Sequence, residues 1–389
     1  RKVFSLSRKP DSLRLHLSAD SRYKLYINGN LAAWGPSKGD DKVWFFDTLQ
    51  AAKYLQQGDN VLAVTVLRYP PLPGKGAHSI FRTNLPGFYL RSEEQTSEGP
   101  LLQADAGWQC RVDRGLLLHP ENPFFAPLYI YEEVTADATL HGWQTMEDPG
   151  TGWQNALSYP WYHISTSVSP GNLQPRTIPM LYLAPRRFVG ITRCQDPGQQ
   201  TTWQAFLAGN TPVRVPPRTK TWVEIDAGEL TTGFFHLSME GGRGASLQLL
   251  QAECYAGEPQ GDPNSYDCHP VKGDRTDFVH GKLFGYTDRY RPSGAGDSHR
   301  PEVYEPFWFR TFRYLRLEVQ TGAEPLVLRD LNYQETGYPL EVKTQVRTSD
   351  QTLDPVWVIS LRTLRRCMHE TYEDCPFYEQ LQYAMDSRS

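Results

Sequence analysis

The sequence predicts a mainly β protein with a helical segment at its C-terminal end, and three observations carry this prediction. Glycine and proline, 31 and 30 residues, are spread through most of the 389 positions with short alternating runs between them. One run sets Leu13, Leu15 and Leu17 among polar residues, the pattern of a strand with one buried face. After about residue 345 the apolar spacing becomes that of a helix. The length predicts two or three domains.

Residues 1–185 are expected to form a first β-sandwich with a loop-rich second half. Alternation continues at Tyr23, Leu25 and Ile27, and Asn28-Gly29 supplies the positive φ angles of a tight hairpin turn. A valine-rich strand is predicted over 61–67. These features together favour a jelly-roll-like arrangement of strands.

A second β-sandwich is expected over 200–340. Its strands are predicted where apolar and polar residues alternate, at 222–226, 234–238, 247–249 and 315–319. The run 213–219 contains two prolines and is read as a linker or crossover, and 255–300 is rich in Gly, Asp, Pro and Ser and is read as long loops.

Residues 345–389 are expected to begin a helical domain that is incomplete within this sequence. Ser349 and Asp350 can cap a helix that runs to about Glu370. Its apolar residues fall on one face: Leu353, Trp357, Leu361, Leu364, Met368. A loop over 371–376 leads to a second predicted helix at Phe377. So short a helical segment cannot bury an amphipathic face alone. Either it packs on the β-domains or, as we expect, a large helical domain follows.

Composition excludes some classes of function. The formal net charge is −4, which argues against a general nucleic-acid binder. No window approaches the roughly 20 apolar residues that a bilayer requires, so no membrane partner is expected. The six cysteines form no CxxC pair and are read as mostly free thiols, and neither a metal nor a cofactor is expected. The compartment stays open, cytoplasmic or secreted.

The densest group of acidic side chains lies at the C-terminal end. Asp374 precedes the second predicted helix, Glu379 falls in its first turns, and Asp386 follows seven residues later. Seven residues are about two helical turns, so Glu379 and Asp386 would share a face that Asp374 can also reach. Tyr378 and Tyr383 lie among them and offer flat apolar surfaces to a sugar.

Two interpretations of this acidic group are open. Carboxylates so close together cannot all ionise freely, and one with a raised pKa could serve as the general acid that cleaves a glycosidic bond. Alternatively, the group is a solvated helix start, where acidic residues are favoured by the helix dipole.

The pattern Asp374-Cys-Pro-x-x-Glu379, with Asp386 seven residues further on, resembles the motif that opens the catalytic domain of α-L-rhamnosidases, family 78 of the glycoside hydrolases. The segments 286–294 and 305–315 are similar to that family as well. The run from Ala19 to Leu62 resembles the galactose-binding-like sandwich of these enzymes.

The resemblance implies an inverting hydrolysis of terminal rhamnose from glycosides or polysaccharides. It makes Glu379 the general acid, while Asp374 and Asp386 hold the rhamnose hydroxyls and tune its pKa. Tyr378 and Tyr383 stand where many relatives have Arg and Trp, and would contact substrate. The first helices would open an (α/α)6 barrel, truncated here, in which a downstream carboxylate is the base. The resemblance therefore implies that this chain alone is inactive.

Two rival functions remain. If the protein is a non-catalytic carbohydrate-binding module, the two sandwiches are still expected, but the acidic group has no catalytic role. Another glycosidase with the same first sandwich, such as a β-galactosidase relative, would continue into a TIM barrel, which fits poorly with paired helices after Ser349.

Two further sets of residues have competing interpretations. Three aromatic residues of the first sandwich are read as core and rim packing in preference to an accessory sugar-binding face: Tyr26, Trp34, Trp44. Three arginines of the second sandwich are expected to pair with acidic residues in preference to contacting substrate: Arg289, Arg310, Arg313.

Overall fold

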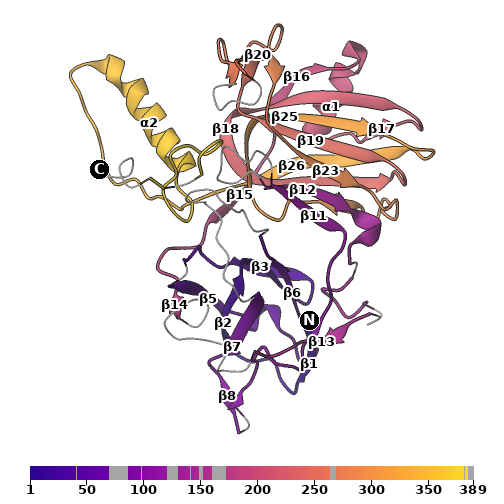
Figure 1. The fold of residues 1–389 in the computed structure, drawn as a ribbon, viewed down its shortest axis with the longest axis vertical. Helices are drawn as coiled ribbons and strands as arrows, with labels where there is room; N and C mark the ends of the chain where they lie inside the picture. The colour runs from indigo at the N-terminus through magenta and orange to yellow at the C-terminus, as the bar shows by residue number, and fades with distance from the viewer. Residues whose placement is uncertain are drawn as a thin grey trace. The chain divides into compact units, whose positions relative to one another are not determined.

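The computed structural model describes residues 1–40, 42–69, 86–97, 99–120, 130–140, 142–148, 152–159, 172–262, 269–380 and 382–383. The chain divides into two compact units (Figure 1). The first contains residues 1–71, 80–114 and 140–179, and the second contains 72–79, 115–139 and 180–389. The fold is mainly β, as the sequence predicts, with two α-helices among the described residues.

The first unit contains two four-stranded sheets. One has the order β1 (Lys2–Leu6), β6 (Gly58–Leu67), β3 (Arg22–Ile27), β4 (Asn30–Gly35). The other has the order β14 (Leu173–Pro175), β5 (Trp44–Gln50), β2 (Arg14–Asp20), β7 (Gly87–Ser92). Shorter elements complete it: the 3-10 turn η1 (Ala52–Tyr54), β8 (Gln95–Thr96) paired with β9 (Gly99–Pro100), and β10 (Gln109–Cys110) paired with β13 (Gln154–Asn155).

The core of the first unit follows the predicted alternation. The three leucines of the first predicted strand are fully buried, and so are the three apolar residues of the second: Leu13, Leu15, Leu17, Tyr23, Leu25, Ile27. The turn at Asn28 and Gly29 has φ values of 51° and 82°, as a tight hairpin between right-twisted strands requires. Trp44 is buried and its indole N–H donates to the Ala19 carbonyl, which confirms the packing role read for this residue.

The second unit is built on one branched sheet of eleven strands. Its main path has the order β11 (Leu116–Pro120), β12 (Ile130–Thr135), β23 (Tyr286–Arg291), β19 (Ser246–Ala252), β25 (Arg310–Gln320), β18 (Lys220–Gly241), β26 (Leu326–Gly337), β15 (Tyr182–Arg186). Three strands branch from it: β16 (Gly190–Cys194), β17 (Val213–Val215), β24 (Glu302–Tyr304). Figure 1 shows these strands running alongside one another.

Several smaller elements surround this sheet. They are the 3-10 turns η2 (Ala136–Ala138), η4 (Pro197–Gln199) and η5 (Gln351–Leu353), the helices α1 (Gln200–Leu207) and α2 (Asp354–Arg366), and the strands β20 (Tyr255–Gln260), β21 (His269–Val271) and β22 (Lys282–Leu283). The core between the sheet and α1 includes Phe206, Phe235, Leu317 and Leu331, each fully buried.

Three features of the second unit differ from the sequence predictions. The run read as a linker at 213–219 contains β17, because Val213 and Val215 point into the core and pair with β26. The stretch read as loops at 255–300 contains β20 to β23, whose short polar runs pair with better-patterned neighbours. Helix α1 was not predicted, since it is short and lies between loop residues.

Strands β11 and β12 come early in the chain, yet they belong to the sheet of the second unit, because β12 pairs with both β11 and β23. The domain boundaries that the sequence analysis places at residues 185, 200 and 340 stay predictions.

Strand β18 is 22 residues long and changes partners at a bulge. Its register against β25 shifts between Asp226 and Thr231, and the chain there passes through Gly228 at a φ of 89°. A side chain at that φ would be strained, so glycine suits this position. Bulges bend a strand and redirect its side chains. The bulge presents Glu229 to helix α2, and Thr232 follows it.

Candidate active site

Helix α2 begins close to where the sequence places it. The Asp350 carboxylate accepts from the Thr352 backbone N–H at 2.9 Å, and Pro355 lies in the first turn, where its missing N–H costs nothing. The helix ends at Arg366, four residues before the predicted end at Glu370. There the backbone turns away, because the Met368 carbonyl accepts the Tyr338 N–H at 2.9 Å and Met368 forms a bridge with Tyr372.

The apolar face of α2 is largely uncovered. Leu353, Trp357 and Leu364 are 49%, 37% and 40% exposed. The C-terminal end of the helix is covered, because Arg366 is buried against acidic residues of the sheet.

The segment 367–380, which contains Asp374 and Glu379, is anchored to the second unit by buried polar contacts. His369 stacks on Phe309 with ring centroids 4.2 Å apart and planes 15° apart. Its Nε2 lies 3.1 Å from the Thr232 hydroxyl and its Nδ1 lies 3.0 Å from the Glu373 carboxylate. The Thr232 hydroxyl donates to the Thr336 carbonyl, so it accepts from His369, which assigns a proton to Nε2.

The far end of the segment is held in a similar way. The buried Gln380 side chain donates to the Thr311 hydroxyl at 3.0 Å and to the Pro376 carbonyl at 2.6 Å. Phe377 is buried and lies 5.5 Å from the ring of Tyr286. The segment is therefore fixed to β18, β23 and β25, although it contains no regular secondary structure.

The second predicted helix at Phe377 is not formed, and the reason lies in Cys375. Its sulfur accepts the backbone N–H groups of Tyr378 and Glu379, each at 3.3 Å. In a helix the Glu379 N–H would donate to the Cys375 carbonyl, four residues earlier. The Gln380 side chain occupies the Pro376 carbonyl, which removes the next helical acceptor. The predicted second helix is thus wrong for the described residues of this segment, and the shared face of Glu379 and Asp386 stays a prediction.

The candidate acidic residues have different surroundings. Asp374 is exposed, and Glu379 is half-buried and accepts from the Tyr383 hydroxyl at 3.3 Å. The Cys375 N–H and the Glu379 carbonyl lie 3.3 Å apart, so the chain between Asp374 and Glu379 forms a closed loop. Asp386 lies outside the described residues.

The two predicted substrate tyrosines lie at the same loop. Tyr378 is half-buried, with the Lys272 ammonium 4.5 Å from its ring centroid. Tyr383 is 39% exposed. The structure thus brings Tyr383 to Glu379, while Tyr378 contacts a lysine and packs at 4.8 Å on Phe377.

Two thiols flank the acidic residues and are poor nucleophiles here. Burial, followed by the charge of Glu373, raises the pKa of Cys367 to about 12. Burial also raises the pKa of Cys375, although it accepts backbone N–H groups. Five cysteines are described and all are free thiols, as the sequence predicts for most of them.

The remaining predicted residues have structural roles. Arg310 binds Asp288 through two hydrogen bonds of 2.8 and 3.0 Å and lies 3.2 Å from Glu132, and Arg313 pairs with Asp226 at 3.2 Å. Both confirm the predicted pairing with acids. Arg289 lies opposite Glu133 in the register of β12 and β23, and its guanidinium carbon is 5.8 Å from the ring centroid of Tyr131.

Two buried polar residues of the same segment were not predicted from the sequence. The side chains of His369 and Glu373 are almost fully buried, and one oxygen of Glu373 has no hydrogen-bond partner among the described residues. Their spacing of four residues was a visible signal, although such a pair is common on helices. Within the described ranges no group of His, Cys, Asp or Glu side chains could hold a metal ion, and no helix is long and apolar enough to cross a membrane.

Comparison with known proteins identifies the fold. No family model matches the sequence, and no curated protein matches it. Among solved structures, a family 78 rhamnosidase from Bacillus sp. GL1 superimposes with a TM-score of 0.72 at 17% identity, covering 100% of this chain and 58% of that one. The α-L-rhamnosidase of Dictyoglumus thermophilum gives 0.64 at 17% identity, covering 97% and 36%.

A third similar structure is the Streptomyces avermitilis α-L-rhamnosidase complexed with L-rhamnose, with a TM-score of 0.60 at 16% identity, covering 97% of this chain and 32% of that one. The chain thus has the fold of the β-rich part of these rhamnosidases, and the resemblance predicted from the sequence is confirmed at the level of the fold. It spans between about a third and about three fifths of their length.

Proposed function

We propose that this chain is part of a glycoside hydrolase of family 78 that releases terminal α-L-rhamnose from glycosides or polysaccharides. The observation that carries the proposal is a coincidence of two independent signals. The acidic motif of Asp374, Glu379 and Asp386 follows the last strand of a chain whose fold is that of solved rhamnosidases. A carbohydrate is the expected partner, and neither metal nor cofactor is needed.

Glu379 is proposed as the general acid that protonates the departing oxygen. Its half-buried position beside Tyr383 lets it face a bound sugar while remaining shielded from bulk water. Asp374 lies on the same closed loop and is exposed, so its carboxylate can accept sugar hydroxyls. Asp386 and Tyr378 are proposed to complete this contact.

Inversion requires a second carboxylate roughly 6.5–9.5 Å from the acid, which leaves room for the attacking water. We propose that this base belongs to a downstream (α/α)6 barrel, as the resemblance implies. It follows that the 389 residues alone should not hydrolyse rhamnosides.

The test replaces Glu379 with Gln in the intact enzyme. Hydrolysis of a rhamnoside with an alkyl aglycone should fall about 10²–10⁴-fold, because this leaving group depends on protonation. A nitrophenyl rhamnoside, whose leaving group is already acidic, should lose much less. Glu258→Gln, at an exposed glutamate on β20, is the matched control and should leave both rates unchanged.

Equal losses on the two substrates would remove Glu379 from the role of acid. Proton NMR of the first turnover reports the anomer released, and β-L-rhamnose is expected. Release of the α-anomer would contradict inversion, and rhamnose binding without any hydrolysis by the intact protein would favour the carbohydrate-binding alternative.

A further inference from the structure

A cavity of about 650 Å³ lies between helix α2 and the sheet of the second unit. Its walls come from α2, from β15, from the end of β26 and the chain that follows it, and from the bulge of β18. Contact between α2 and β18 places these elements next to each other, and Figure 1 shows α2, in yellow, beside that end of the sheet. The volume is within the range of roughly 300–1,000 Å³ that small-molecule sites occupy.

Positive charge prevails around the cavity. Four arginines line it: Arg186, Arg362, Arg365, Arg366. Three glutamates also line it, but Glu341 pairs with Lys343, which is outside the lining. Glu229 and Glu335 are then the two carboxylates that offset four guanidinium groups. An anion entering the cavity would find an excess of cations.

Glu335 organises the buried part of this wall. Its carboxylate accepts from the Tyr182 hydroxyl at 2.8 Å, from Arg186 at 3.3 Å and from Arg366 at 3.2 Å. Arg366 also donates to Glu229 at 2.8 Å through the same terminal nitrogen. The guanidinium of Arg366 is therefore held in place through its Nη2 atom.

Donors remain on this wall after these pairs are counted. The Nε of Arg366 is buried and has no hydrogen-bond partner among the described residues. A buried donor without a partner costs about 1–3 kcal/mol, so a ligand that accepts from it is favoured. Arg365 is exposed, and its side chain makes no hydrogen bond or ion pair within the described part of the chain. Carboxylates are the natural partners of such guanidinium groups.

Another part of the lining is less polar. It is formed by Tyr338, Pro339 and Leu340, of which the tyrosine and leucine are half-buried. A cavity lined by both an aromatic and aliphatic surface and a set of arginines suits a ligand with one apolar face and one anionic group. A pyranose ring with a carboxylate has both, because its axial C–H groups form a flat apolar patch.

We propose that this cavity binds a hexuronic acid unit of a carbohydrate, with the carboxylate accepting hydrogen bonds from Arg365 and Arg366 and the ring packed on Tyr338. The choice of a carbohydrate rests on the proposed function, whereas the preference for an anion rests on the arginines. The site would give the enzyme a preference for acidic glycans.

Calorimetry on the 389-residue chain tests the site with methyl galacturonoside and methyl galactoside, which differ at the carboxylate. The uronate should bind, and the neutral sugar should bind at least tenfold more weakly. Arg365→Gln should weaken uronate binding about tenfold to a hundredfold, as expected for a charge-assisted hydrogen bond. Arg347→Gln removes the same charge from an exposed position outside the cavity and should have no effect. Thermal unfolding verifies that both variants fold.

Any of the following outcomes would overturn the proposal: equal binding of the two sugars, equal losses in the two arginine variants, or acetate binding as tightly as the uronate. Tighter binding of galactose 6-sulfate than of the uronate would also overturn it, because the site would then select a different anion. None of these measurements involves hydrolysis. A failure of the uronate site is therefore distinguishable from a failure of the proposed rhamnosidase activity, which the Glu379 variant reports.

Discussion

Two polar clusters in the second unit have the same composition and different surroundings. Each contains one glutamate, two arginines and one tyrosine. In the first, Glu224 of β18 accepts from Arg193, Arg316 and Tyr255. In the second, Glu335 of β26 accepts from Arg186, Arg366 and Tyr182. Because the residue types are the same, any difference between the two clusters comes from how each is buried and paired.

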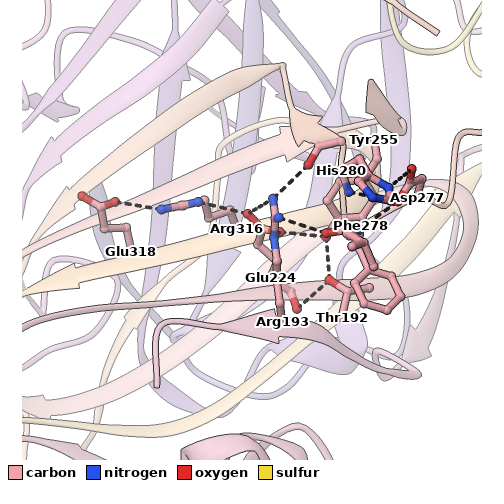
Figure 2. A network of polar contacts seen from close by, with 11 residues as sticks. Thr192, Arg193, Glu224, Tyr255, Asp277, Phe278, His280, Arg316 and Glu318 are labelled. Carbon is pink, nitrogen blue, oxygen red and sulfur yellow. Dashed lines mark hydrogen bonds and ion pairs between the residues drawn. The ribbon is translucent and has the colours of Figure 1, made fainter. Parts of the chain in front are cut away.

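The Glu224 cluster is closed in the sense that its buried groups are all paired within the described structure, although the side chains of Arg193 and Arg316 are each 30% exposed. Figure 2 shows its arginines converging on the carboxylate from two sides. Glu224 is fully buried, and Arg193 also donates to the carbonyls of Phe278 and Gly281 at 2.9 and 3.2 Å. Arg316 lies 4.1 Å from the ring of Trp222. None of the buried polar atoms in this cluster is without a partner in the described structure.

The Glu335 cluster is open on one side. The side chain of Arg186 is 52% exposed, the Nε of Arg366 is unpartnered among described residues, and a cavity adjoins both. The difference teaches that an ion cluster stabilises the fold when the protein satisfies all its groups. It becomes a candidate binding site when some donors remain for a ligand.

The largest expected effect is at the closed cluster. Glu224→Gln removes a fully buried charge that two arginines share, and breaking a buried pair costs about 3–5 kcal/mol. Urea unfolding of the chain should show this loss in the free energy of unfolding. Glu258→Gln, whose side chain is 65% exposed, should change it by less than about 0.5 kcal/mol. A loss below about 1 kcal/mol in Glu224→Gln would mean that water replaces the carboxylate at the two arginines.

A smaller effect is expected at the open cluster. Glu335→Gln should cost about 1–3 kcal/mol at neutral pH, because water can reach Arg186 and replace part of what is lost. The same urea titration measures it. A cost as large as that of Glu224→Gln would show that the two clusters are equally buried and would break the comparison.

The cost of Glu335→Gln should also depend on pH. Burial works to raise the pKa of Glu335, but the Tyr182 hydrogen bond and the Arg366 charge outweigh it and lower the pKa below 4.5. The stabilisation is therefore fully present above about 4.5 and is lost as the pH falls through the lowered pKa. The difference between wild type and variant should shrink below pH 4.5, and a difference that grows there would reverse the assignment.

The sequence predicts the strands better than these clusters. Alternation at Leu13, Leu15 and Leu17 identifies a buried face because the period of a strand is fixed by its geometry. The start of α2 is predictable because Asp350 acts locally. The clusters join residues far apart in the chain, such as Tyr182 and Glu335, so no local pattern reveals them.

The acidic segment illustrates the same limit. The order of Asp374 and Glu379 is visible in the sequence and indicates the chemistry. The shape of their loop is not visible, because it depends on a cysteine sulfur that takes two backbone N–H groups and on the contact of Gln380 with Thr311. In this segment, side-chain hydrogen bonds that form only in the folded chain replace the backbone hydrogen bonds of a helix.

The smallest expected effect on stability belongs to Arg365, and it sharpens the comparison most. Its side chain has no partner among the described residues, so Arg365→Gln should change the free energy of unfolding by less than about 0.5 kcal/mol. Arg316→Gln, in the closed cluster, should cost several times more, because it leaves Glu224 with one fewer cation. Parallel urea titrations of the two variants measure both. Similar losses in the free energy of unfolding would mean that Arg365 stabilises the folded chain. Its presence in the cavity would then need no ligand to explain it.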